Sequence, residues 1–351
     1  MGLAAAPQPW SGSYSIGKNA WAMAHTTQFT APGWHYIDSA GGYLGGNRAN
    51  GSYVTLKSTN NTDYSTVIET MDAKASQTFT AAVTGGLSTG AVHVWATNLN
   101  SDNPSSYMVR GADITPAANG TFSLILQPGY VYTLTTTTGG GKGTATSPAQ
   151  HAMGLPYADN FDGYAVGKFA KDLMDQQGAF EIAACDAGRP GRCVRQMTAQ
   201  APINWAFQST PYALLGDTTW RNYTVSTDVL LEKAGQAELI GRANTQKRFT
   251  PADIDAYYLR VSDTGAWSLL RNNANDGNKV TLASGTVSAL GTNRWHSIGL
   301  SFSGSTIKAV IDGTAVRTIT DGTLAAGQVG YGTSQGETAQ FDNLSITGSS
   351  S

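Results

Sequence analysis

The stretch AWAMAHTTQFTAPGWHYI, residues 20–37, decides how the rest of the chain is divided. Its alternation predicts one strand over residues 20–29, a turn at Pro32-Gly33 and a second strand that opens at Trp34. The first 33 residues carry three large apolar side chains, Trp10, Trp21 and Phe29, and are too few to bury them alone. We therefore expect these side chains to need a partner surface beyond this segment.

The composition is that of a polar, weakly charged all-β protein of the extracellular kind. The chain has 351 residues, of which 13% are charged and 41 are glycine, and its length suits about two domains. A net charge of -2 argues against partners such as nucleic acid or an anionic membrane surface. No apolar run approaches the roughly 20 residues of a transmembrane segment, and residues 1–10 do not have the pattern of a signal peptide.

Residues 34–140 are expected to form a β-sandwich domain, because short alternating runs recur there with turn signals between them. The predicted strands are residues 51–58, 64–71, 77–83, 91–99, 120–127 and 130–137. A segment rich in Gly, Ser and Thr follows, and residues 141–155 are therefore assigned to a linker.

Residues 156–351 are expected to form a larger sandwich of the concanavalin-like, laminin-G-type jelly-roll class. The predicted strands are residues 223–231, 237–243, 256–262, 266–271, 279–283, 296–302, 305–311, 315–319 and 338–346. The Asp312-Gly313 pair predicts a tight hairpin turn, which requires positive φ. Residues 169–175 are predicted to be one helical turn or a loop, and no other segment has a helical period.

The two cysteines, Cys185 and Cys193, flank the segment DAGRPGR. This spacing favours a small loop closed by a disulfide, which would imply an oxidising compartment and a secreted or extracellular protein. The alternative is two reduced, unrelated thiols.

Several segments, in their order and spacing, resemble the galactocerebrosidase (galactosylceramidase) family, glycoside hydrolase family 59. They extend from Pro9 to Thr347, and they are AHTTQFT (24–30), PGW (32–34), GSYV (51–54), IETM (68–71), YTLTT (132–136), PINWA (202–206), GR (241–242) and AQFDN (339–343). The resemblance implies a catalytic (β/α)8 barrel, then a β-sandwich, then a lectin-like domain, with residues 1–33 as a remnant of the end of the barrel. It also implies removal of galactose from galactosylceramide with retention.

The resemblance supplies three candidate substrate-binding residues. Trp205 matches the lectin-domain tryptophan that packs on the sugar, where an aromatic ring suits the C–H face of galactose. Trp10 would lie at the edge of the sugar cleft, and His25 would lie on the last barrel strand, whose C-terminal end faces the substrate. The alternative for each is an ordinary packed side chain.

The resemblance also implies a structural calcium site in the lectin-like domain. Asp159-Asn160-Phe161-Asp162 opens that domain and Phe341-Asp342-Asn343 closes it. Because the first and last strands of such jelly rolls lie side by side, Asn160, Asp162 and Asp342 would meet, and their oxygens suit Ca²⁺. The alternative is a set of solvated carboxylates at strand ends.

The catalytic pair of the family is not matched in this chain. A retaining glycosidase needs two carboxyl groups about 5–5.5 Å apart, and none of the glutamates follows the barrel-strand pattern; these are Glu69, Glu181, Glu232, Glu238 and Glu337. An arginine-bearing insertion of the animal members is also unmatched, because Asp72-Ala73-Lys74-Ala75 leads directly into the next predicted strand.

Together these patterns predict a non-catalytic C-terminal part of a galactosylceramidase-like β-galactosidase, which shapes the galactose site and binds carbohydrate. Its expected partners are a galactose-containing glycan or glycolipid and a catalytic barrel encoded upstream. Whether the chain is an enzyme stays open. The alternatives are a stand-alone secreted lectin-like protein and a purely structural secreted β-protein.

Overall fold

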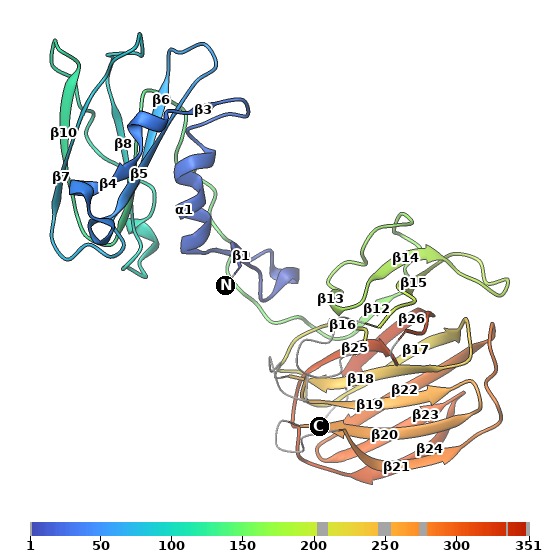
Figure 1. The fold of residues 1–351 in the computed structure, drawn as a ribbon. Helices are drawn as coiled ribbons and strands as arrows, with labels where there is room; N and C mark the ends of the chain where they lie inside the picture. Colours follow the sequence, from blue (N-terminus) through green and yellow to red (C-terminus); the bar gives the residue numbers. More distant parts are fainter. Residues whose placement is uncertain (1, 202–209, 245–253, 274–278, 335, 349–351) are drawn as a thin grey trace. The chain divides into compact units, whose positions relative to one another are not determined.

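The computed structural model describes residues 2–201, 210–244, 254–273, 279–334 and 336–348 (Figure 1). The chain forms two compact units. The first comprises Met1–Pro7 and Gly12–Ala149, and the second comprises Gln8–Ser11 and Gln150–Ser351. In the described residues every strand pairing is antiparallel, which confirms the predicted all-β class. Among these residues no helix is both long and apolar enough to cross a bilayer.

The first unit contains one α-helix, α1, at Lys18–Thr27, and two principal sheets. The larger sheet has the order β3-β5-β6-β11-β8-β9, with β4 paired to β5, and the smaller sheet pairs β7 with β10. The strands of the unit are β1 Ala4–Ala5, β2 Ser15–Ile16, β3 His35–Tyr36, β4 Gly42–Tyr43, β5 Ser52–Lys57, β6 Tyr64–Glu69, β7 Gln77–Ala82, β8 His93–Asn98, β9 Val109–Arg110, β10 Thr121–Leu126 and β11 Tyr130–Thr135. All six strands predicted in this region are confirmed.

The predicted strand over residues 20–29 is wrong, because this segment is helix α1. Alanines alternate with larger residues here, which imitates a strand, yet Trp21, Ala24, His25 and Phe29 also repeat at helical spacing. Alanine is the strongest helix former, and the helical stripe is the face that becomes buried: Ala24 and Phe29 are 7% and 1% exposed. The helix is followed by the expected Pro32-Gly33 turn, with Gly33 at φ 91.

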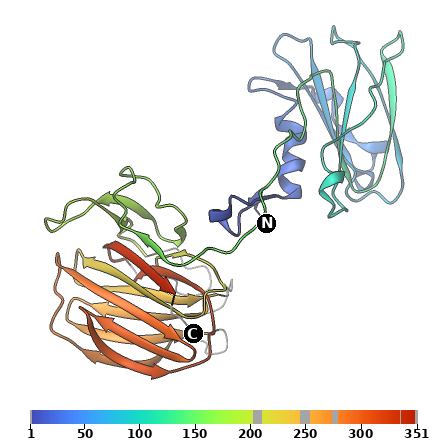
Figure 2. The same ribbon diagram turned by 180° about the vertical axis from the view of Figure 1, so that it is seen from behind.

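The first unit has three layers (Figures 1 and 2). Helix α1 covers one face of the larger sheet, where Ala24 and Phe29 pack with Met108 beside Trp21 and Trp95. The small β7-β10 sheet covers the opposite face, where a core includes Ile68, Phe79, Phe122, Leu126 and Leu134. The surface beyond residues 1–33 that Trp21 and Phe29 were expected to need is therefore supplied by this chain's own larger sheet.

The second unit is a sandwich of two large sheets (Figure 1). One has the order β14-β15-β26-β17-β22-β23-β24, with β12 paired to β26, and the other has the order β13-β16-β25-β18-β19-β20-β21. The strands are β12 Tyr157–Asp159, β13 Met174–Gln177, β14 Phe180–Ala184, β15 Arg192–Gln196, β16 Tyr212–Leu215, β17 Tyr223–Leu231, β18 Gln236–Ala243, β19 Ala256–Ser262, β20 Ala266–Asn272, β21 Val280–Thr286, β22 Trp295–Ser303, β23 Thr306–Ile311, β24 Thr314–Thr320, β25 Gln328–Thr333 and β26 Ala339–Gly348.

Two local predictions in this unit are confirmed. The β23–β24 hairpin closes through Asp312 and Gly313, at φ 48 and φ 74, with Ile311 paired to Thr314. The first and last strands also lie side by side, because Tyr157 of β12 pairs with Ile346 of β26 and Asp159 pairs with Leu344. Between the sheets lies one core in which Tyr223, Leu300, Phe302, Tyr331 and Phe341 are almost completely buried.

Strands β12 to β16 and β25 were not predicted. They are short, or broken by glycine, as in Gln328–Thr333, which reads QVGYGT. Of the segment 169–175, predicted as one helical turn or a loop, residues 169–173 form a loop and β13 begins at Met174. Packing between the two sheets, rather than local alternation, therefore makes these segments strands.

Candidate functional site

His25, a predicted sugar-binding residue, is completely buried in the first unit. Its Nδ1 lies 2.8 Å from Thr133 Oγ1 and its Nε2 lies 2.7 Å from Thr97 Oγ1. The Thr133 hydroxyl donates to the His25 carbonyl, so it accepts from Nδ1–H, while the Thr97 hydroxyl accepts from the Met108 amide and donates to Nε2. This assigns a neutral ring with the proton on Nδ1, and burial lowers the pKa of His25 to about 4. Its role in sugar binding stays a prediction.

Of the two tryptophans predicted to bind sugar, only Trp10 lies within the described residues. Trp10 is half-buried, packs on the core of the second unit and donates from Nε1 to the His151 carbonyl at 2.7 Å. Its need for a surface beyond residues 1–33 is thus met within this chain. Trp205 lies outside the described residues, so its stacking role stays a prediction.

The predicted disulfide is present and closes the loop Cys185–Cys193 between β14 and β15. Val194, the next residue in β15, belongs to the core, so Cys193 faces away from it. By the same alternation, Asp228 of β17 and Asp342 of β26 lie on the face opposite to Val229 and Phe341. The loop therefore covers the outer face of the sheet at the polar residues of β17 and β26.

Arg189, at the tip of this loop, binds both carboxylates. Its Nη1 lies 2.8 Å from Asp228 Oδ2 and 2.8 Å from Asp342 Oδ2. Its guanidinium carbon lies 3.9 Å from the ring centroid of Trp295, whose Nε1 donates to the Asp186 carbonyl. We call Arg189, Asp228, Asp342 and Trp295 the arginine clamp; it joins the loop to β17, β22 and β26 through charge and cation–π contact.

A second ion pair lies on the same outer face. Arg195 donates from Nε and Nη2 to the two carboxylate oxygens of Glu232, at 2.5 and 2.7 Å. Gln340 bridges Glu232 and Asp186 through its Nε2. Burial alone would raise the pKa of Glu232, but Arg195 and Gln340 lower it below its ordinary value. Glu232 is thus held as a structural carboxylate.

The three residues predicted to bind calcium lie around the two ends of the disulfide loop. Asn160 and Asp162 bond to each other, and Asp162 Oδ1 accepts from the Arg192 amide at 2.8 Å. Asp342 accepts from the Asn343 amide at 2.7 Å and from Arg189. Burial raises the pKa of Asp342, although Arg189 opposes that rise.

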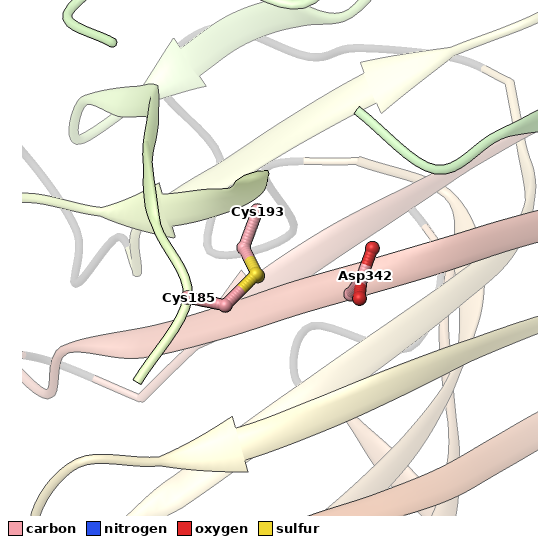
Figure 3. A group of neighbouring side chains, drawn as sticks. All are labelled: Cys185, Cys193 and Asp342. Carbon is pink, nitrogen blue, oxygen red and sulfur yellow. A yellow bond between two sulfur atoms is a disulfide. The ribbon is translucent and has the colours of Figure 1, made fainter. Parts of the chain in front are cut away.

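These amide and carboxylate oxygens have the chemistry that suits Ca²⁺, but in the structure Arg189 already supplies positive charge to Asp342. Among the described residues, the only three His, Cys, Asp or Glu side chains with ligand atoms within 4.8 Å of one another are Cys185, Cys193 and Asp342 (Figure 3). The two sulfurs form the disulfide and cannot serve as thiolate ligands. The calcium site stays a prediction.

Sequence analysis missed a charged cluster on the other sheet. Glu238 of β18 is 1% exposed and accepts from Arg260 Nε at 2.8 Å and from Lys279 Nζ at 3.3 Å. Lys279 Nζ also lies 4.0 Å from the Tyr258 ring centroid. Burial raises the pKa of Glu238, but Lys279 and Arg260 outweigh it and hold that pKa below its ordinary value. The sequence feature that could have indicated this cluster is a glutamate and an arginine on neighbouring strands, because Glu238 of β18 pairs directly with Arg260 of β19.

Three of the described glutamates, Glu69, Glu232 and Glu238, have structural partners. Glu69 accepts from the Ser52 hydroxyl at 2.7 Å and from the Met71 amide at 3.0 Å, and Glu232 and Glu238 pair with arginines. These hydrogen bonds account for the positions of three of the five glutamates without a catalytic role.

The chain matches two protein-family models. Residues 41–141 match the glycosyl hydrolase family 59 central domain, and residues 175–349 match the galactocerebrosidase C-terminal lectin domain. Galactocerebrosidase from Mus musculus is 30% identical over 372 residues, covering 98% of this chain and 52% of the relative. The Homo sapiens relative is 30% identical over 381 residues, with the same coverage. The chain thus spans about half the length of these curated relatives.

Solved structures of low identity were also found. A carbohydrate-binding module, CBM66, from Bacillus subtilis has 14% identity and a TM-score of 0.38, covering 50% of this chain and 95% of that one. A Bacillus subtilis protein of unknown function with a galectin-like fold has 13% identity and a TM-score of 0.39, covering 56% of this chain and 96% of that one.

Proposed function

The chain belongs to the galactocerebrosidase family, glycoside hydrolase family 59, with its central and C-terminal lectin domains, and we propose that it is a non-catalytic, galactoside-binding part of such an enzyme. The observation that carries the proposal is the match of residues 175–349 to the C-terminal lectin domain of that family. The proposed ligand is a β-galactoside of a glycan or glycolipid, and the proposed partner is a catalytic barrel.

The described carboxylates support a non-catalytic role. A retaining hydrolase needs one carboxyl group free to attack and another free to transfer a proton. Glu232 and Glu238 each have an arginine partner, and Glu69 accepts two hydrogen bonds. Releasing any of these carboxylates for chemistry would leave a buried or half-buried partner without its bonds, which is costly.

Sugar binding is assigned to Trp205, with Trp10 and His25 as secondary candidates. An aromatic face binds the apolar face of galactose without ordering a flexible side chain. For His25 the proposal requires an indirect role, since its ring is buried and both nitrogens are hydrogen-bonded.

Calcium at Asn160, Asp162 and Asp342 is the remaining part of the proposal. The ion would hold together the opening segment of the lectin-like domain and its last strand, which already pair through β12 and β26. Since Arg189 is bonded to Asp342, calcium and Arg189 would compete for that carboxylate. Secretion is proposed on the disulfide, which persists in oxidising compartments.

The experiment is a calorimetric titration of the whole chain with methyl β-galactoside, in the presence of calcium. We expect saturable binding that Trp205→Ala weakens at least tenfold. Trp34→Ala is the control, because Trp34 is a half-buried tryptophan in the first unit. Methyl α-mannoside should not bind.

Binding of equal strength in the Trp205 and Trp34 variants would contradict the assignment of Trp205. An absence of galactoside binding to the unaltered chain would contradict the proposal as a whole and favour a purely structural protein.

A further inference from the structure

A cavity of about 400 Å³ opens between the two sheets of the first unit. Its walls come from β5 and β6 on one side and from β7 and Phe122 of β10 on the other. This volume is in the range of small-molecule pockets. Among the described residues, its lining includes neither His25 nor Trp10.

One wall is polar where a sandwich core would ordinarily be apolar. On β5 and β6 three cross-strand pairs share this face: Tyr53 with Ile68, Thr55 with Thr66, and Lys57 with Tyr64. The Thr55 and Thr66 hydroxyls bond to each other at 2.9 Å, so they satisfy their own hydrogen-bonding needs. The outer pair, Lys57 and Tyr64, is different.

Tyr64 is 4% exposed, and its hydroxyl is buried without a hydrogen-bond partner. A buried hydroxyl of this kind costs free energy unless something bonds to it. Burial raises the pKa of Tyr64 to about 12, so the phenol stays protonated and can donate. A ligand oxygen in the cavity would supply the missing acceptor.

Lys57 stands beside Tyr64 in register and is half-buried. Within the described residues its ammonium has no ion pair. The cavity lining contains no Asp or Glu, so Lys57 is its only charged side chain. The wall therefore offers two adjacent donors and a net positive charge, which favour an anionic oxygen ligand.

Aromatic and aliphatic side chains form part of the remaining lining, beside the polar residues Ser39, Asn61, Thr80 and Thr84. Tyr53 and Phe79 pack edge to face with ring centroids 5.3 Å apart, and Phe122 is 4% exposed in the same lining. Small side chains of β7, Ala81 and Ala82, leave the space open. An aliphatic or aromatic body would bury its surface here and gain the usual hydrophobic free energy.

We propose that this cavity binds a small carboxylate with an apolar body, its carboxylate on Lys57 and the Tyr64 hydroxyl and its body among Tyr53, Phe79 and Phe122. A neutral sugar would leave the ammonium unneutralised and place hydroxyls against these rings. A plain hydrocarbon would leave both donors without acceptors. A carboxylate would neutralise the ammonium and accept from the Tyr64 hydroxyl.

The test is a calorimetric titration of the full chain with octanoate at neutral pH, compared with octanol and with methyl β-galactoside. We expect octanoate to bind at least tenfold more tightly than octanol. Lys57→Met should weaken octanoate binding about tenfold, and Tyr64→Phe should weaken it several-fold. The control variants are Lys74→Met and Tyr36→Phe, which alter exposed side chains of the same unit.

Tyr64→Phe removes a hydroxyl that bonds to nothing, so the variant should fold, which circular dichroism and the melting temperature will verify. The proposal is overturned if octanoate does not bind, or if octanol binds equally well. It is also overturned if the Lys57 and Tyr64 variants bind octanoate as the controls do, or if these variants weaken galactoside binding instead.

Discussion

Both ring nitrogens of His25 are hydrogen-bonded to hydroxyl groups and not to a charged side chain. Thr97 and Thr133 hold its two nitrogens, and the ring has no exposed surface. A proton added at Nε2 would create a buried cation with no carboxylate bonded to it. This explains why burial lowers the pKa of His25 to about 4.

This ring makes the first unit sensitive to acid. The unfolded chain binds a proton near pH 6.5 and the folded chain only near pH 4, so between these values the unfolded state binds more protons. Stability should therefore fall by roughly 3 kcal/mol from pH 7 to pH 4 through this residue. Urea unfolding at several pH values measures the free energy of unfolding of the first unit. The variant His25→Gln should remove the part of its pH dependence that His25 causes. An identical slope in the variant would show that other groups cause it.

Arg189 is the residue on which the arginine clamp depends. Arg189→Met would leave Asp228 and Asp342 near each other without a counter-charge, and Asp342 is only 5% exposed. We expect a loss of about 2 kcal/mol, less than for a fully buried pair because Arg189 and Asp228 are partly exposed. Chemical denaturation measures it. Adding Asp342→Asn should recover at least half the loss, whereas additive losses would refute the coupling.

At the scale of elements, strands with clear alternation could be predicted from sequence, but α1 could not. In residues 20–29 alanines alternate with larger residues, as in a strand, whereas Trp21, Ala24 and His25 repeat at helical spacing on the side of α1 that packs on the sheet. The short strands β12 to β16 were missed because the other sheet holds them in place.

Met23 lies on the exposed face of α1 and is 52% exposed. Substitutions at Met23 can therefore test whether this segment is a helix or a strand. In a helix, Met23→Ala should be more stable than Met23→Thr by about 0.5 kcal/mol, because threonine loses rotamer freedom against the preceding turn. A strand would reverse this order, because β-branched residues favour strands. Thermal unfolding of the two variants decides between them.

The disulfide could be predicted from Cys185 and Cys193 because their spacing is local. The clamp could not, because Arg189 meets carboxylates about 39 and 153 positions later in the chain. The pairing of the first and last strands of the domain, β12 with β26, was correctly predicted, but the positive partner of Asp342 depends on the path of the loop. Side-chain partners across sheets are set by register, which the sequence alone does not specify.

At the scale of the whole molecule, residues 41–141 and 175–349 match two domains of one glycoside hydrolase family. The chain covers 52% of the mouse relative. Three of its glutamates, Glu69, Glu232 and Glu238, bond to neighbouring groups of the sheets. We propose that this chain recognises a galactoside and that hydrolysis belongs to a barrel domain.

The most direct test of this claim is ligand-observed proton NMR of the purified 351-residue chain with methyl β-galactoside and calcium. One sample then reports binding, through saturation transfer from protein to sugar, and hydrolysis, through the signals of free galactose. We predict transfer to the galactoside, none to methyl α-mannoside, and no free galactose. Release of galactose, or an absence of transfer, would contradict the account.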